Sequence, residues 1–135
     1  MIIVGRKDYM GKMRGADRGS KFHQKFSQFP STEEAVDYLV KLEPNCNIIG
    51  VEITDGATAI QNIDFKCKPT AFIFGNEGKG LSEKQRSICH EFVYIPQFST
   101  GLASINVACA SAVILHHYAV NSNFKETKHI NGKFM

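Results

Sequence analysis

Apolar residues occur in short runs separated by polar segments, and the spacing within the runs alternates between strand-like and helical. Runs rich in Val, Ile and Phe at 1–5, 48–53, 70–74 and 92–96 predict buried strands. The segment 54–68 has neither spacing and predicts irregular structure. Strands that are apolar at nearly every position are typical of a parallel sheet with both faces covered. Because helical segments alternate with these strands, the pattern predicts an α/β fold, with helices on both faces of a parallel sheet.

Three segments have the spacing of helices. The first is 31–42, where Ser31 and Glu34 match a capping box at the amino end. The second is the short segment 82–89. The third, 104–120, is apolar on nearly every side, and a helix with that pattern is either buried or packed against a second subunit.

The composition narrows the class of protein. The chain has 135 residues, 43% of them hydrophobic, which predicts one globular domain with a continuous core. No apolar run approaches the ~18 residues of a membrane span, so we expect no integral membrane segment. The first residues lack the basic-then-apolar layout of a secretory signal peptide.

The cysteine pattern favours free, buried or half-buried thiols over a disulfide framework or a metal site. The four cysteines lie about twenty residues apart and include no C-x-x-C pair. Neighbouring side chains such as those of Cys89 and His90 rarely reach one ion, so we predict no metal. Free thiols indicate a reducing compartment. We therefore expect an intracellular location, the cytoplasm first and an organelle as the alternative.

Charge is distributed unevenly along the chain. Residues 1–29 hold seven basic and two acidic side chains, whereas residues 30–66 hold two basic and seven acidic ones. The Gly-rich basic segment 11–25 has few apolar residues and predicts a loop. Basic side chains on such a loop either contact nucleic-acid phosphates or simply face solvent, and charge alone leaves both interpretations open. The candidates for phosphate contact are Arg14, Arg18 and Lys21.

Loops rich in glycine or small residues follow three of the predicted strands, at 54–57, 75–82 and 97–106. In a parallel sheet the ligand site lies beyond the carboxyl ends of the strands. The spacing of Gly75 and Gly80 is that of a phosphate loop, but the residues after Gly80 do not match a Walker A motif, and G-x-G-x-x-G is absent as well. The three loops therefore predict a ligand pocket of another kind.

Motifs in these loops resemble motifs 2 and 3 of the SpoU (TrmH-like) RNA 2′-O-ribose methyltransferases of the SPOUT superfamily. The segments that carry the resemblance are 74–82, 94–96 and 104–110, which occur in the expected order and at the expected distances. The resemblance covers about residues 45–120, with a weaker match at 2–7. It implies an α/β fold with a C-terminal trefoil knot and a homodimer formed through the C-terminal helix. It also implies methyl transfer from S-adenosylmethionine to a ribose 2′-hydroxyl of tRNA or rRNA.

The same resemblance assigns roles to individual residues. Catalytic roles fall on Glu77, Ser104 and Asn106. Cofactor contacts fall on Thr54, Gly75, Asn76, Glu77, Ile95, Gln97, Ser104 and Ile105. Two simpler interpretations compete with these roles: Glu77 accepts hydrogen bonds from loop amides, and Ser104 is only a helix N-cap.

Two departures from the family pattern qualify the resemblance. Ile105 stands where motif 3 usually has Leu, a mild change in an apolar contact. The family's motif 1, an Asn followed by an Arg on a strand-helix unit ahead of the element that matches 2–6, has no counterpart in the sequence. We therefore expect residues 1–135 to form a single SPOUT domain lacking that unit. A catalytically silent RNA- or cofactor-binding remnant is the main alternative to an active enzyme, and an unrelated nucleotide-binding module is a weaker one.

Overall fold

The fold is built on a parallel sheet, as the sequence predicts. The computed structural model describes residues 2–5, 27–65, 68–98, 105–130 and 133–134. The central sheet has four parallel strands whose spatial order is β4 (Thr58–Ala59), β6 (Glu91–Tyr94), β3 (Asn47–Val51) and β5 (Thr70–Phe74).

The strand bounds differ slightly from the predicted ones. β3 and β6 end two residues earlier than the apolar runs that predict them, which leaves Glu52 and Ile95 beyond the strands. The short strand β4 and the 3-10 helix η2 (Ile60–Asn62) lie within the segment predicted to be irregular. A strand of two residues is too short to show the alternation on which a sequence prediction depends.

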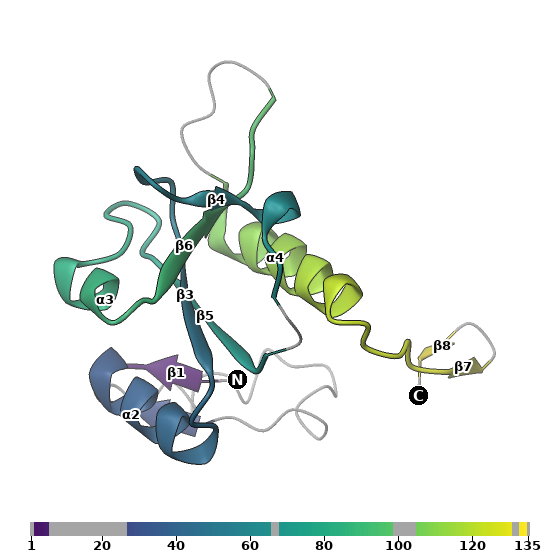
Figure 1. The fold of residues 1–135 in the computed structure, drawn as a ribbon, viewed down its shortest axis with the longest axis horizontal. Helices are drawn as coiled ribbons and strands as arrows, with labels where there is room; N and C mark the ends of the chain where they lie inside the picture. Colours follow the sequence, from purple (N-terminus) through teal and green to yellow (C-terminus); the bar gives the residue numbers. More distant parts are fainter. Residues whose placement is uncertain (1, 6–26, 66–67, 99–104, 131–132, 135) are drawn as a thin grey trace.

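The main core lies between one face of this sheet and the helix α4 (Val107–Asn121), which runs along it (Figure 1). Ile49 of β3, Val93 of β6 and Ile114 of α4 are completely buried there. Phe65 packs edge-on against the rings of Phe72 and Tyr118 in the same core. Burying several large apolar side chains between two elements supplies most of the energy that holds α4 on the sheet.

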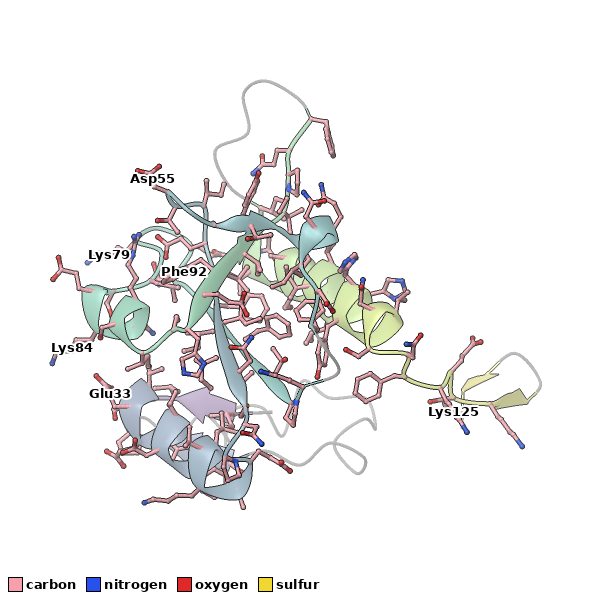
Figure 2. The ribbon with its side chains drawn as sticks, in the orientation of Figure 1. Glu33, Asp55, Lys79, Lys84, Phe92 and Lys125 are labelled. Carbon is pink, nitrogen blue, oxygen red and sulfur yellow. The ribbon has the colours of Figure 1, made fainter. Side chains whose placement is uncertain are left out.

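The opposite face of the sheet meets the end of the helix α3 (Glu83–Ser87). Because Ile49 faces α4, its neighbour Gly50 faces the other way. A Cβ built on Gly50 would lie 2.6 Å from the ring of Phe92 and 3.0 Å from the sulfur of Cys89, which follows α3. Figure 2 likewise shows Phe92 on the side of β6 that faces α3. Helices therefore lie on both faces, as predicted.

The amino-terminal part forms a second, smaller layer. β1 (Ile2–Val4) pairs in parallel with β2 (Ser27–Phe29), and α2 (Thr32–Leu42) follows directly. The Ser31 hydroxyl accepts a hydrogen bond from the Glu34 amide at 3.2 Å, which is one half of the predicted capping box. A complete capping box occurs instead at α3, between Ser82 and Gln85.

α4 is much less covered than its all-round apolar sequence predicts for a buried helix. Val113, Leu115 and Val120 have exposed fractions of 46%, 51% and 61%, and Ile114 is the buried residue of the helix. The outer face of α4 is thus apolar and open to solvent in the single chain. The sequence predicts that this helix is either buried or packed against a second subunit. Burial in the chain's own core is wrong for the outer face.

The carboxyl-terminal segment forms a small antiparallel hairpin that the sequence analysis does not predict. Its strands are β7 (His129–Ile130) and β8 (Lys133–Phe134), and it extends away from the rest of the molecule (Figure 1). The basic segment 11–25 and residues 99–104 lie outside the described residues, so the predicted loop and the predicted knot stay predictions. None of the described helices is long and apolar enough to cross a membrane.

Candidate functional site

A pocket of about 260 Å³ lies at the carboxyl ends of β3, β5 and β6, where the sequence predicts a ligand site. Strand ends supply part of its wall, and the segments that follow β5 and β6 and the start of α4 supply the rest. The lining residues are Val51, Glu52, Ile53, Phe74, Gly75, Asn76, Glu77, Gly78, Gly80, Tyr94, Ile95, Gln97, Ile105, Val107 and Ala110.

The segment after β5 is a tight loop that closes on itself. The Asn76 amide donates to the Gly80 carbonyl at 3.0 Å, and the Gly80 amide donates to the Asn76 carbonyl at 2.8 Å. The side-chain oxygen of Asn76 accepts the Gly78 amide at 2.9 Å. Gly80 has φ +65°, a left-handed conformation that glycine adopts without strain. Each of these bonds fixes part of the rim of the pocket.

Asn106 and Glu77, two of the three predicted catalytic residues, are joined directly. The Asn106 amide group donates a hydrogen bond to Glu77 Oε1 at 2.8 Å. The carbonyl oxygen of the same side chain accepts the amides of Ala108 at 2.9 Å and Cys109 at 3.3 Å, which makes Asn106 the N-cap of α4. A single side chain thus links the loop after β5 to the start of α4.

The N-cap of α4 bears on the alternative interpretation of Ser104, in which that residue only caps the helix. A pure capping role was the alternative for Ser104, but the helix begins at Val107 and its cap is Asn106. Ser104 itself lies outside the described residues. Capping and the contact with Glu77 use different atoms of Asn106, the oxygen and the nitrogen of its amide, so the two roles are compatible.

Most of the predicted cofactor-contacting residues meet in the pocket. Gly75, Asn76, Glu77, Ile95, Gln97 and Ile105 all line it. Thr54 does not, and the residues of its segment that line the wall are Val51, Glu52 and Ile53. The predicted RNA-contacting residues Arg14, Arg18 and Lys21 lie outside the described residues.

Gln97 carries a buried polar atom that no described group satisfies. Its Oε1 atom is buried in the wall of the pocket and has no hydrogen-bond partner in the part of the chain that the structure describes. A buried amide oxygen without a partner is unfavourable unless a ligand or water supplies a donor. Because the Oε1 atom has almost no accessible surface, it does not face the open pocket in this conformation.

Sequence reasoning missed Glu52 in the wall. Its side chain is 16% exposed, its Oε2 accepts the Leu81 amide at 2.9 Å, and it forms an ion pair with Arg86 of α3. A signal was present, because Glu52 is the one charged residue in the otherwise apolar run 48–53. A charge in such a run needs a specific partner.

The thiols of the described cysteines have no hydrogen bond to Asn106, Glu77 or Asn76. Burial raises the pKa of the Cys46 thiol, and burial followed by the nearby Glu52 carboxylate raises the pKa of Cys89. Both thiols are therefore protonated near neutral pH and poor nucleophiles. Cys109 is exposed, unlike the predicted buried or half-buried state, and Cys67 lies outside the described residues. Within the described ranges no three His, Cys, Asp or Glu side chains gather as a metal site.

The fold and the site define the class: an α/β protein with a pocket built from loops at the carboxyl edge of a parallel sheet. The sequence profile of the SpoU rRNA Methylase family matches residues 1–116. The chain belongs to this family, whose methyltransferases use S-adenosylmethionine.

Individual relatives agree with the family assignment. The chain is 39% identical over 72 residues to an uncharacterised tRNA/rRNA methyltransferase of Mycobacterium leprae, covering 53% of this chain and 22% of the relative. It is 38% identical over 52 residues to the mitochondrial rRNA methyltransferase 1 of Homo sapiens, covering 36% of this chain and 15% of that protein. The chain thus spans less than a quarter of these curated relatives.

Solved structures support the fold. The SpoU methyltransferase AviRb of Streptomyces viridochromogenes, solved in complex with AdoMet, matches with a TM-score of 0.71 and 28% identity. The match covers 86% of this chain and 47% of AviRb. An AdoMet-bound rRNA methyltransferase of Sinorhizobium meliloti matches with a TM-score of 0.75 over 93% of this chain and 46% of that one, and at 22% identity it supports the fold alone.

Proposed function

We propose that this protein is an S-adenosylmethionine-dependent RNA methyltransferase that methylates a ribose 2′-hydroxyl of tRNA or rRNA. The observation that carries the proposal is the pocket itself. It is lined by segments that follow three parallel strands, and its rim holds the linked pair Glu77 and Asn106 at the start of α4. Membership in the SpoU family supports the reaction class.

The residues present fit S-adenosylmethionine. Ile95 and Ile105 offer apolar walls for an adenine ring. Gly75 and Asn76 bring backbone close to the pocket without bulky side chains. When bound, the cofactor supplies a methyl group on a positively charged sulfur.

Positioning is the main contribution of the protein to such a reaction. The acceptor oxygen must lie behind the methyl group, in line with the bond that breaks, and holding it there supplies much of the rate enhancement. Our candidates for orienting a ribose at the rim are Asn106 and Glu77, which are joined by a hydrogen bond, and Ser104 is the third candidate for the same task. The chain's own contribution is therefore a fixed polar edge beside the cofactor pocket.

The remaining family features are part of the same proposal. We infer a C-terminal trefoil knot and a homodimer formed through α4. The exposed apolar side chains of Val113, Leu115 and Val120 support a subunit contact, because water-exposed apolar surface of this kind marks interaction sites. We also infer an intracellular, cytoplasmic location, which the free thiols of Cys46, Cys89 and Cys109 support.

A methyl-transfer assay tests the proposed reaction. The protein is incubated with bulk tRNA or bulk rRNA and tritium-labelled S-adenosylmethionine, and the RNA is then digested to nucleosides. We expect label in 2′-O-methylated nucleosides from one of the two RNA pools, and an excess of unlabelled cofactor to suppress it. Label on a base would contradict the ribose assignment. Cofactor binding with no label in either pool would favour the silent binding protein instead.

The basic segment yields a separate prediction about RNA. We expect the triple change of Arg14, Arg18 and Lys21 to Gln to weaken binding. It should also reduce the slope of log affinity against log salt by about 2–3, because each lost phosphate contact removes about 0.7–0.9 from the slope. Fluorescence anisotropy over a salt series measures this slope. The exposed residues Lys41, Lys68 and Lys84, changed together to Gln, remove the same charge elsewhere. Equal slopes in both triple variants would show that the segment makes no specific contact.

A further inference from the structure

Two charged residues hold the peptide groups on both sides of Leu81. Glu52 Oε2 accepts the Leu81 amide at 2.9 Å, and Arg86 Nε donates to the Leu81 carbonyl at 3.3 Å. Glu52 and Arg86 also form an ion pair with each other. Leu81 is 4% exposed, so its side chain is fixed in the core at the same point. We call Glu52, Arg86 and Leu81 the clamp.

The clamp acts on the loop that forms the rim of the pocket. Leu81 follows Gly80, the last residue of the closed turn that begins at Asn76. A Cβ on Gly80 would lie 2.8 Å from Glu52 Oε1, so the carboxylate packs directly against the backbone of the turn. Glu77, within the turn, contacts Asn106. Moving Leu81 would therefore move the loop and the Glu77 carboxylate with it.

Glu52 comes from a distant part of the sequence, 29 positions before Leu81 and 34 before Arg86. Glu52 follows β3, Leu81 ends the loop after β5, and Arg86 lies in α3. Glu52 is mostly buried at 16% side-chain exposure, whereas Arg86 is 42% exposed. A hydrogen bond from a backbone amide to a buried carboxylate is stronger than one between neutral groups. The clamp thus connects the glycine-rich loop after β5 to the segment that follows β3 and to α3.

We propose that Glu52 and Arg86 are a positioning pair that holds the Asn76–Gly80 loop in its cofactor-binding conformation and so sets the affinity for S-adenosylmethionine. This inference rests on the proposed function, because it assumes that the pocket takes the cofactor. Glu52 also lines the pocket, whereas Arg86 does not, so an effect of Arg86 on affinity must pass through Glu52 and the loop. The pair acts by ordering the loop before binding, so that binding does not have to supply the free energy of ordering it.

Glu52→Gln and Arg86→Gln, separately and together, test the pair. Glu52→Gln keeps an oxygen for the Leu81 amide and removes the charge. Calorimetric titration with S-adenosylmethionine should show each single change weakening affinity by about tenfold. The double variant should lose little more than either single one, because both remove the same interaction. Arg86→Lys, which keeps the charge, should recover part of the affinity.

A matched control and a second measurement separate positioning from general damage. Lys84→Gln removes a positive charge from the same helix, at a side chain that points away from the sheet (Figure 2), and should leave affinity unchanged. Hydrogen exchange at the Leu81 amide in the unliganded protein should be faster in Glu52→Gln than in wild type. If Glu52→Gln does not fold, Arg86→Gln tests the positioning pair instead, because Arg86 is the more exposed partner. Cofactor affinity and hydrogen exchange at the Leu81 amide are then measured in that variant.

The outcomes distinguish this inference from the proposed function. Wild-type affinity in both single variants, or additive losses in the double variant, would overturn the positioning pair while leaving the cofactor pocket intact. If the wild-type protein binds no S-adenosylmethionine, the proposed function fails. In that case, an unchanged rate of hydrogen exchange at the Leu81 amide in Glu52→Gln would also refute the clamp. A faster rate would show that the clamp orders the loop, although the pocket binds no cofactor.

Discussion

Changing Asn106 to Ser should reduce methyl transfer by at least about 100-fold while leaving the helix α4 intact. The reason is that the oxygen and the nitrogen of the Asn106 side-chain amide make different hydrogen bonds. Its oxygen caps α4 through Ala108 and Cys109, and its nitrogen donates to Glu77. Ser keeps a capping oxygen and loses the donor. Losing one positioned polar group beside reacting atoms typically lowers the rate by about 10²-fold or more.

The variant Asn106→Ala separates the helix-capping role of Asn106 from its proposed role in methyl transfer. It loses the donor as Ser does, and it also loses the cap, so its free energy of unfolding should fall by about 1 kcal/mol. Turnover in the tritium assay should be equally low in the two variants, whereas only Ala should lower the denaturation midpoint. Wild-type turnover in Asn106→Ser would contradict the assigned role and leave Asn106 as a helix cap alone.

The second large effect is expected at Gly75, where Ala should strongly weaken cofactor binding. A Cβ at this position would lie 2.5 Å from the carbonyl carbon of Gly80, 2.7 Å from the nitrogen of Leu81 and 2.8 Å from the Gly80 Cα. All three are backbone atoms, so no side-chain rotation relieves the clash and the loop itself must move. We expect affinity for S-adenosylmethionine to fall beyond about 100-fold and stability to fall by about 1–3 kcal/mol.

Gly78→Ala is the matched control for this change. It lies in the same loop, and a Cβ there meets only the side-chain oxygen of Asn76 at 3.6 Å, an ordinary contact. Gly78 also lines the pocket, so calorimetry should give a small loss of affinity for Gly78→Ala and a much larger one for Gly75→Ala. If Gly75→Ala binds as tightly as Gly78→Ala, the close approach of the loop to Gly75 does not shape the cofactor site.

The main strands and helices could be predicted because their apolar residues follow a clear spacing. Ile48–Val51 and Thr70–Phe74 are nearly continuous apolar runs, and both form adjacent parallel strands. β4 escaped prediction because two residues carry no periodicity. The covering of the outer face of α4 could not be predicted. An apolar helix face has the same sequence pattern whether its own chain or a second subunit covers it.

The site was predictable where its residues lie in contiguous motifs and not where it depends on distant contacts. Gln97, Glu77 and Asn106 occur within loops that directly follow strands, so the topology alone brings them to one edge. Glu52 was missed because its partners follow 29 and 34 positions later in the chain. The N-cap of α4 was ambiguous for another reason: Ser104 and Asn106 are both good capping residues, and only the observed start of the helix decides between them.

The most direct measurement of the central claim is a calorimetric titration of the wild-type protein with S-adenosylmethionine. The pocket between the loops after β3, β5 and β6 predicts saturable binding at one site per chain, with affinity in the micromolar range and a marked loss in Gly75→Ala. No heat of binding at high micromolar cofactor, from protein shown to be folded, would contradict the assignment of this pocket to S-adenosylmethionine.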